Sequence, residues 1–506
     1  MTAEPPGDPA VARLAEAILV PPFPGHDPPD WILTALERGL AGVTLFGPNI
    51  AGDDQLAALT ARLRLAAAEP VLAIDEEGGD VTRIGHLAGS RYPGNAALGA
   101  VDDVAATEAV YHALGAELAD LGINVDLAPS VDVNTAADNP VIGTRSFGSG
   151  TELVARHAAA AVTGLQSAGV AACAKHFPGH GSTTSDSHDA IATVDVSLDL
   201  LARRDLPPFA AAIAAGARAV MPGHLRVPEL TGDLPASLSA AALTGLLRGE
   251  LGFTGVIISD ALEMRAVSRP YGLCEAAVLA VMAGTDLLCF GRDQGRRSYL
   301  AVRQALVTAV GSGRMPAARL EEAAGRVAEL RRWAVTARLA AGAAGRAGGG
   351  ARREPAGADG VDVGLAAARR AVRVAGRALR GLNDPFVVEV VPPANVAVGP
   401  VPWGLEAWVP ARSILRIPVA ADGLAAAADA ALAAAAGRSL VVVVRDAHRY
   451  ATAQDVVSRL VAARPDTVVV EMGLPVWRPP GGSYVTTYGA ARTSSLAAAE
   501  LLGLVR

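Results

Sequence analysis

The sequence contains little cysteine, a single lysine and no long apolar run. Three cysteines cannot close a disulfide framework, and each lies among apolar residues, so Cys173, Cys274 and Cys289 are expected to be free thiols in a reducing compartment. No apolar stretch reaches the length that a membrane span requires. The N-terminal residues lack the basic start, sustained apolar stretch and cleavage site of a signal peptide. These absences predict a cytoplasmic protein without a membrane partner.

Positive charge and aromatic side chains are also scarce. With a formal net charge of -7, the chain lacks the basic surface that nucleic-acid-binding proteins usually carry, so no nucleic-acid partner is expected. Hydrophobic residues make up 51% of the 506 residues, so the burial of a core is not limiting. The length exceeds one ordinary domain, but it fits an α/β barrel of about 250 residues or more with one smaller domain.

Short apolar runs alternate with Ala/Leu-rich helical stretches between residues 15 and 335, the pattern of repeated βα units around a parallel sheet. The eight runs that we predict to be strands are Ala17–Val20, Gly42–Phe46, Pro70–Ile74, Asn124–Leu127, Val170–Ala174, Ala219–Met221, Gly255–Ser259 and Asp286–Cys289. Eight units predict a closed (β/α)8 barrel of the TIM type over residues 1–340. Barrel enzymes build their sites at the C-terminal ends of the strands. The polar residues at or just beyond these ends are Asp75, Arg145, Lys175, His176, His224 and Asp260.

The remainder of the chain predicts a second domain. An Arg/Glu-rich helix is expected at 317–340, and the Gly/Ala-rich stretch at 341–365 has no apolar periodicity and predicts a flexible linker. After the linker, strand-like runs alternate with helices, which predicts a small, open, parallel α/β sandwich over 366–506. The predicted strands of this domain are Phe386–Val391, Leu440–Val444 and Thr467–Val470.

The densest polar cluster is KHFPGHG at 175–181, followed by Asp186-Ser187-His188. Its first residue is the only lysine among 44 basic residues, either by chance survival or because a compact point charge is needed there. Pro178 and Gly179 exclude a continuous helix, so we expect the whole cluster on a loop that leaves the fifth strand.

Three interpretations of this cluster compete. A metal site is disfavoured because, without a helix, the histidine spacing matches no standard ligand pattern, and a purely structural loop is the second alternative. The third is acid/base catalysis. The imidazole of His188 titrates near neutrality, and Asp186 can fix its tautomer and raise its proton affinity. Small residues at 181–185 would let the pair swing over a bound substrate, so we favour this interpretation.

Two further motifs place carboxylates at strand ends. In VIISDALEM, Asp260 ends an apolar strand, where it either caps the next helix or, paired with a His/Asp dyad, attacks an anomeric carbon to form a covalent glycosyl-enzyme. In AIDEEGGDVTRI, Gly78 and Gly79 allow a tight turn, so Asp75 and Arg83 can point into the mouth of the barrel and hold sugar hydroxyls. Acidic residues at strand ends are common, and this second motif is weak alone.

Together and in this order, KHFPGHG with DSH, DEEGG, IGTRSF and SDALEM resemble glycoside hydrolase family 3, in particular its bacterial β-N-acetylglucosaminidase branch, over residues 15–335. The C-terminal part resembles the second domain of two-domain members more loosely. Two departures concern substrate details: Asp80 stands where this branch often has Arg, and Gly223 stands where Ala is more usual.

The resemblance assigns roles by position. Asp260 matches the nucleophile, and His188 with Asp186 matches the dyad that serves as acid/base in this branch. The residues expected to bind N-acetylglucosamine are Asp75, Arg83, Arg145, Lys175 and His176, to which we add His224 at the end of the sixth predicted strand. One carboxylate, two guanidiniums, one ammonium and one imidazole can hold several hydroxyls at once.

The resemblance implies a retaining β-N-acetylglucosaminidase that acts by double displacement on a small carbohydrate such as a peptidoglycan fragment, with no metal or organic cofactor. Two rival mechanisms would cleave the same glycosidic bond. In one, the substrate's own acetamide attacks, supported by the adjacent Asp75 and Glu76. In the other, phosphate replaces water as the acceptor. The rival of another class is an inactive sugar-binding protein. The oligomeric state, monomer or homodimer, stays open.

Overall fold

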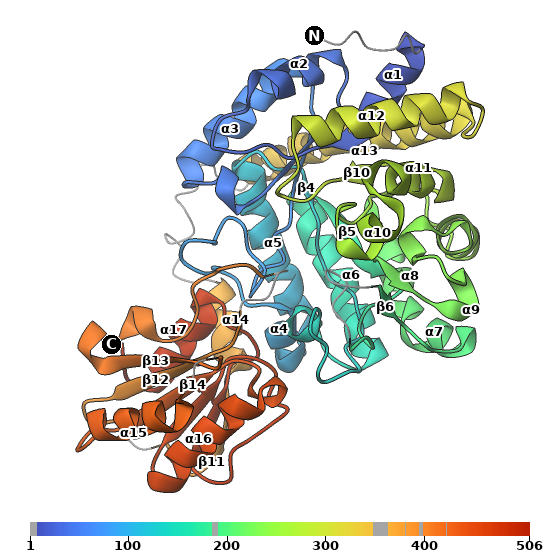
Figure 1. Cartoon of the computed structure of the whole chain (residues 1–506). Coiled ribbons are helices and arrows are strands. Elements are labelled where there is room, and N and C mark those ends of the chain that lie inside the picture. Colours follow the sequence, from blue (N-terminus) through green and yellow to red (C-terminus); the bar gives the residue numbers. More distant parts are fainter. Residues whose placement is uncertain are drawn as a thin grey trace. The chain divides into compact units, whose positions relative to one another are not determined.

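The computed structural model describes residues 8–184, 191–347, 363–379, 381–393, 398–420 and 423–505 (Figure 1). Its internal contacts divide the chain into two compact units. The barrel unit comprises Met1–Glu76, Thr107–Thr135 and Ser149–Arg353, and the sandwich unit comprises Glu77–Ala106, Ala136–Gly148 and Glu354–Arg506. Two excursions from the N-terminal part of the chain therefore belong with the C-terminal residues.

All eight predicted strands of the barrel unit are confirmed. They are β1 (Leu19–Val20), β2 (Gly42–Leu45), β3 (Val71–Ile74), β4 (Val125–Asp126), β5 (Ala171–Phe177), β7 (Ala219–Pro222), β9 (Val256–Ile257) and β10 (Leu288–Cys289). Strands β2, β3, β4, β5, β7 and β9 form one parallel sheet in that order, and β1 pairs with β10. A parallel bridge between Ile258 and Leu287 joins β9 to β10, and the Thr44 hydroxyl donates to the carbonyl of Val20 at 3.2 Å. These two links close the ring.

Alternate residues of the strands fill the interior of the ring, and helix α13 contributes Val327 and Leu330 to the same apolar cluster. The helices that alternate with the strands are α1 (Pro9–Glu16), α2 (Asp30–Arg38), α3 (Asp53–Ala66), α5 (Val104–Asp120), α6 (Thr151–Ser167), α7 (Leu198–Arg204), α8 (Leu206–Ala214), α9 (Pro228–Thr231), α10 (Arg265–Tyr271), α11 (Leu273–Ala283), α12 (Arg296–Gly311) and α13 (Ala317–Ala347), with a π-helix at Ala241–Glu250. A short parallel pair, β6 (Ala192–Thr193) with β8 (Leu225–Arg226), lies outside the ring. None of the helices in the described ranges combines the length and the apolar character of a membrane span.

The position of one motif differs from the prediction. Residues Lys175, His176 and Phe177 were expected on a loop, but they are the last three residues of β5. The backbone of Lys175 is paired on one side, where its carbonyl accepts from the amide of Val131 at 2.7 Å, and it is in register with Met221 of β7 on the other. The strand ends only at Pro178, which has no amide hydrogen to donate. Strand β5 therefore ends three residues later than predicted.

The sandwich unit has one sheet of six strands in the order β11-β16-β15-β14-β12-β13, parallel except for the β11–β16 pair. Its strands are β11 (Arg373–Gly376), β12 (Phe386–Val391), β13 (Ile414–Pro418), β14 (Leu440–Val444), β15 (Val468–Glu471) and β16 (Ser483–Thr486). The three predicted strands are β12, β14 and β15, and each is confirmed. Its helices are α4 (Asn95–Val101), α14 (Val363–Ala371), α15 (Leu424–Ala434), α16 (Ala451–Ala463) and α17 (Arg492–Leu501).

Both faces of this sheet are buried. Val388 and Val442 pack with α15 and α16, and the alternate residues Val387 and Val441 pack with α17. A strand of a parallel sheet that is covered on both sides needs apolar side chains on both faces, which explains why β14 is Leu-Val-Val-Val-Val. Helix α13 continues to Ala347 and α14 begins at Val363, so the prediction of a linker at 341–365 is wrong at both of its ends. Residues 348–362 lie outside the described part, and the linker stays a prediction there.

Candidate active site

The only lysine is buried at the C-terminal end of β5. Its ammonium donates to Oδ1 of Asp75, the residue that follows β3, whose side chain is 22% exposed. Asp126, the last residue of the intervening strand β4, is fully buried and accepts from the amide of Glu76 at 3.0 Å. Burial raises the pKa of Asp126 well above its ordinary value, with the charge of Glu76 adding to the effect. An ion pair thus spans the ends of β3 and β5 above a carboxyl group that resists ionisation.

Asp132 organises the residues around His176, and sequence reasoning missed it. Its carboxylate accepts from Nδ1 of His176 at 2.8 Å, from the amide of His180 at 2.7 Å and from the Ser130 hydroxyl at 3.0 Å. Burial alone would raise the pKa of Asp132, but the charges and hydrogen bonds of the two histidines hold it below the ordinary value. Because a carboxylate only accepts, Nδ1 of His176 carries its hydrogen, and Nε2 of a neutral ring is the acceptor.

The described start of the 178–188 loop is held tightly. The His180 ring contacts Oγ1 of Thr183 through Nδ1 at 2.6 Å, and the Thr183 hydroxyl donates to the His180 carbonyl at 3.0 Å. A Cβ at Gly181 would lie 1.9 Å from the carbonyl oxygen of Val133, so only glycine fits. The predicted dyad, Asp186 and His188, lies outside the described residues, and its role stays a prediction.

Asp260 lies just beyond β9, where the sequence placed it. The residue is half-buried, and its Oδ1 accepts from the amide of Ala261 at 2.7 Å. His224, which follows β7, is fully buried: its Nε2 donates to the carbonyl of Ala261 at 3.0 Å, and its Nδ1 accepts from the Ser237 hydroxyl at 2.7 Å. Burial raises the pKa of the nearby Glu263, and the charge of Asp260 adds to that effect. The carboxylate at 260 is thus supported from β7.

Gly223, one of the two departures from the resemblance, lies against this region. A Cβ at this position would be 2.9 Å from Leu225 and 3.2 Å from the Cβ of His176, so alanine here requires the flexible end of the Leu225 side chain to move. The Cβ of His176 and the glycine are therefore packed directly together.

Five polar residues consequently share the C-terminal ends of the barrel strands. They are Asp75 after β3, Asp132 after β4, Lys175 and His176 at the end of β5, and Asp260 after β9. This is the face on which (β/α)8 enzymes carry their catalytic groups. No group of three or more His, Cys, Asp or Glu side chains with the arrangement of a metal site occurs in the part of the chain that the structure describes.

The remaining two predicted sugar ligands belong to the sandwich unit. Arg145, the last residue of a 3-10 helix at Gly143–Arg145, is buried and pairs with both carboxylate oxygens of Glu77 at 2.9 and 2.6 Å. Arg83 is half-buried in the same unit. Glu77 was not predicted as a partner, although it stands in the DEEGG motif. A bidentate pair of this kind fixes the plane of the guanidinium.

Asp80, the other departure, has a structural explanation. Its Oδ2 accepts from the Thr144 hydroxyl at 2.6 Å and pairs with Arg445 at 3.2 Å, and its Oδ1 accepts from the amide of Ala490 at 2.8 Å. The buried carboxylate therefore joins both N-terminal excursions of the sandwich unit to the ends of its sheet. An arginine at position 80 would place a second cation beside Arg445.

The sequence is similar to those of known proteins. Residues 30–330 match the family model described as "Glycosyl hydrolase family 3 N terminal domain". A β-hexosaminidase of Xylella fastidiosa (strain M23) is 38% identical over 301 residues, which are 56% of this chain and 87% of the relative. Beta-hexosaminidase A of Pseudoalteromonas piscicida is 36% identical over 282 residues, or 51% of this chain, and the chain spans only 47% of that enzyme's length.

A solved structure extends the similarity over both units. The glycoside hydrolase family 3 β-N-acetylglucosaminidase from Paenibacillus sp. str. FPU-7 has a TM-score of 0.83 and 32% sequence identity, and the match covers 98% of this chain and 97% of that one. The barrel with a second α/β unit, the strand-end carboxylates and the match over residues 30–330 lead to one assignment. The chain belongs to glycoside hydrolase family 3.

Proposed function

We propose that this protein is a retaining β-N-acetylglucosaminidase that hydrolyses terminal β-linked N-acetylglucosamine. The observation that carries the proposal is the placement of Asp260 on the same barrel face as the Asp75–Lys175 pair and the Asp132–His176 pair. A carboxylate beside a set of fixed hydroxyl ligands is what attack on an anomeric carbon requires. The names of the relatives, β-hexosaminidase and β-N-acetylglucosaminidase, support the choice of sugar.

The proposed reaction has two displacements. In the first, an oxygen of Asp260 bonds to C1, the bond from C1 to the aglycone oxygen breaks, and His188 gives its proton to that oxygen. In the second, neutral His188 takes a proton from water, the water oxygen bonds to C1, and the bond to Asp260 breaks. Asp186 holds the tautomer of His188 throughout. The configuration at C1 is inverted twice and therefore retained.

The other residues divide into ligands and supports. Asp75, Lys175 and His176 hold hydroxyl or acetamido groups of the sugar, and Arg83 and Arg145 are assigned the same task. Asp132 is a positioning residue, because it acts on the sugar through His176. His224 is assigned to positioning as well, since both of its ring nitrogens are used within the protein and one of them holds Ala261.

The substrate class and compartment follow from the same assignment. Peptidoglycan fragments and related N-acetylglucosaminides present the required terminal sugar. The three cysteines, all within the described residues, form no disulfide, which supports work in the cytoplasm. The chain uses no metal in the proposed chemistry, because the proton transfers and the nucleophile are supplied by side chains.

Release of 4-nitrophenol from its N-acetyl-β-glucosaminide tests the proposal. Asp260→Ala is expected to bind the substrate with a similar Kd and to lose turnover by roughly 10³-fold or more, because the nucleophile has no substitute. Asp293→Ala, an exposed carboxylate of the same unit paired with Arg292, is the matched control and should keep full activity. Near-normal turnover of Asp260→Ala would refute the assignment.

The same assay separates water from phosphate as acceptor. With hydrolysis, the rate is independent of added phosphate and the product is free N-acetylglucosamine. With phosphorolysis, the rate rises with phosphate and the product is a sugar 1-phosphate. Absence of any turnover in the wild-type protein would instead favour a sugar-binding protein without activity.

A further inference from the structure

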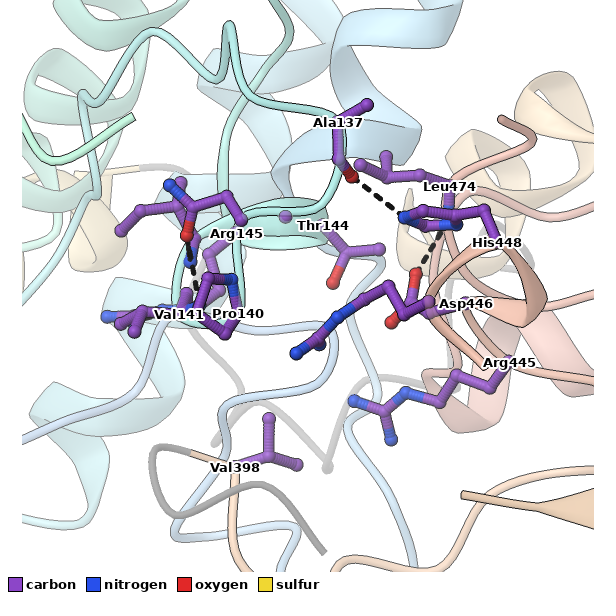
Figure 2. Close-up of a pocket in the computed structure, with 14 residues that line it drawn as sticks. Ala137, Pro140, Val141, Thr144, Arg145, Val398, Arg445, Asp446, His448 and Leu474 are labelled. Atoms are coloured by element: carbon purple, nitrogen blue, oxygen red, sulfur yellow. Dashed lines mark hydrogen bonds between the residues drawn. The ribbon is translucent and has the colours of Figure 1, made fainter. Parts of the chain in front are cut away.

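The sandwich unit contains a cavity of whose lining the glycosidase assignment uses only Arg145. Figure 2 shows the residues that line it. The space between them, including the part open to solvent, is about 350 Å³. One wall is the 137–145 excursion, including Thr144 and Arg145. The opposite wall consists of residues that follow strands β12, β14 and β15, namely Val398, Arg445, Asp446, His448, Arg449 and Leu474.

The topology of the sheet explains why a cavity forms there. Strand β12 has β13 on one side and β14 on the other, so the chain leaves β12 in one direction and returns past it to start β14. The connections at the C-terminal ends of β12 and β14 therefore diverge. Open parallel sheets bind their ligands in the crevice at such a switch point. The cavity residues Val398 and Arg445 follow these two strands.

The cavity leaves one guanidinium for a ligand. Three guanidiniums line it, and two of them are compensated, Arg145 by Glu77 and Arg445 by Asp80. The one carboxylate of the lining, Asp446, accepts from the amide of Leu474 at 3.0 Å. Among the residues that the structure describes, Arg449 has no carboxylate partner, and its guanidinium lies 5.7 Å from the centre of the Tyr450 ring. A planar guanidinium in this state matches the geometry of a carboxylate or phosphate.

His448 supplies a second, independent observation. Its Nε2 lies 2.8 Å from the carbonyl of Ala137, and because a carbonyl only accepts, Nε2 carries a hydrogen (Figure 2). Its Nδ1 is buried and has no hydrogen-bond partner within the described ranges. A buried polar atom without a partner is costly and calls for a missing ligand group. Because Nε2 carries the hydrogen, Nδ1 of the neutral ring is an acceptor, to which a hydroxyl of a ligand can donate.

We propose that this cavity is a second ligand site, which binds a small molecule through an oxyanion group, either carboxylate or phosphate, held by Arg449, while a hydroxyl of the same molecule donates to Nδ1 of His448. The proposal does not rest on the glycosidase activity, because none of its evidence comes from the barrel unit. The buried Asp80–Arg445 pair forms part of its support, so the departure at position 80 and the cavity belong to the same arrangement.

Isothermal titration calorimetry on the full chain tests the site with three matched sugars, glucose 6-phosphate, glucuronate and glucose. They share a pyranose ring and differ at C6, so they separate phosphate, carboxylate and neutral hydroxyl. Binding of at least one anionic probe, with no binding of glucose, is expected. Binding of glucose as strongly as of both anions, or no binding of any probe at millimolar concentration, would overturn the proposal.

Variants then locate the site. Arg449→Gln is expected to weaken binding of the anionic probe about tenfold or more. Arg449→Lys should weaken it less, because lysine keeps the positive charge but lacks the planar guanidinium. The control is Arg459→Gln, an exposed residue of α16 that pairs with Asp429 and does not line the cavity. Equal binding by all four proteins would refute the site. Melting curves of the variants confirm that each remains folded, and hydrolysis by Asp260→Ala reports separately on the barrel.

Discussion

Replacement of Asp132 by Asn is expected to destabilise the barrel unit and to weaken sugar binding together. The buried carboxylate accepts from the His176 ring, the His180 amide and the Ser130 hydroxyl at 2.7–3.0 Å. Asparagine offers one accepting oxygen, and its amide group donates. With its oxygen kept on the His180 amide, the amide group of the new residue would face the Nδ1 hydrogen of His176, so the ring would have to change tautomer or turn.

The magnitude follows from those contacts. A buried donor that loses its partner costs about 1–3 kcal/mol, and hydrogen bonds to a charged group contribute about 1.5–3 kcal/mol each. Because the ring of His176 can turn after the change, we expect a loss of roughly 2–4 kcal/mol in the free energy of unfolding. The same rotation removes a fixed sugar ligand, so KM should rise more than kcat falls.

The dependence on pH has a definite sign. The pKa of Asp132 is lower in the folded protein than its ordinary value of 3.8, so the carboxylate stabilises the fold at every pH above that value. The contribution disappears as pH falls through the folded pKa, where both states are protonated. The stability difference between wild type and Asp132→Asn should thus be constant from about pH 6 to 8 and shrink below about pH 4.

Calorimetric melting of the full chain at several pH values measures this difference, and steady-state kinetics at pH 7 measures KM and kcat. Asp199→Asn is the control, because Asp199 is exposed and its i,i+4 pair with Arg203 should contribute about 0.5 kcal/mol or less. Wild-type stability and KM in Asp132→Asn would refute the positioning role. A stability difference that grows on acidification would refute the pKa argument.

Three further outcomes test separate parts of the structure. Asp80→Ala should lower the free energy of unfolding by about 3 kcal/mol or more, because it leaves a buried guanidinium without its partner, and urea denaturation that gives less than about 1 kcal/mol would contradict this. Gly181→Ala should reduce kcat/KM by roughly tenfold or more, since the new methyl group meets a backbone carbonyl and displaces the loop, whereas unchanged kinetics would mean that the loop tolerates the shift. In the native protein at pH 8, a disulfide reagent should titrate one thiol, Cys274, because the other two cysteines are buried and burial raises the pKa of Cys289 to about 12. All three thiols should react in urea. Reaction of more than one thiol in the native protein would contradict the burial of Cys173 and Cys289.

The hydrophobic periodicity and the turn residues of the sequence were sufficient to predict most of the fold. All eight barrel strands are found where apolar runs were flanked by helical stretches. In the sandwich unit, β14 is a run of five apolar residues, and β12 and β15 each have three consecutive apolar residues beside a buried glutamate. The strands β13 and β16, Ile-Leu-Arg-Ile-Pro and Ser-Tyr-Val-Thr, were missed because polar residues interrupt them and their pairing with β12 and β15 supplies the remaining stabilisation. The same tertiary pairing extends β5 to Phe177.

The site was only partly predictable for a related reason. Strand-end residues such as Asp75 and Asp260 are visible in a sequence, because each ends a recognisable apolar run. Asp132 follows β4 by several residues within DLAPSVDVN, and nothing local shows that it reaches His176. The pairing of Asp80 with Arg445 joins positions far apart in the chain, and no periodicity encodes such a contact. Only the alternation of Val131, Asp132 and Val133 could have suggested a buried carboxylate.

The most direct test of the central claim is to trap the glycosyl-enzyme. A fluorinated N-acetylglucosaminide that slows the second displacement should add one sugar mass to the protein, and peptide mapping should find it on Asp260. An adduct on Asp75 or Glu76, or rapid turnover of the analogue through the substrate's own acetamide with no adduct at all, would contradict the account.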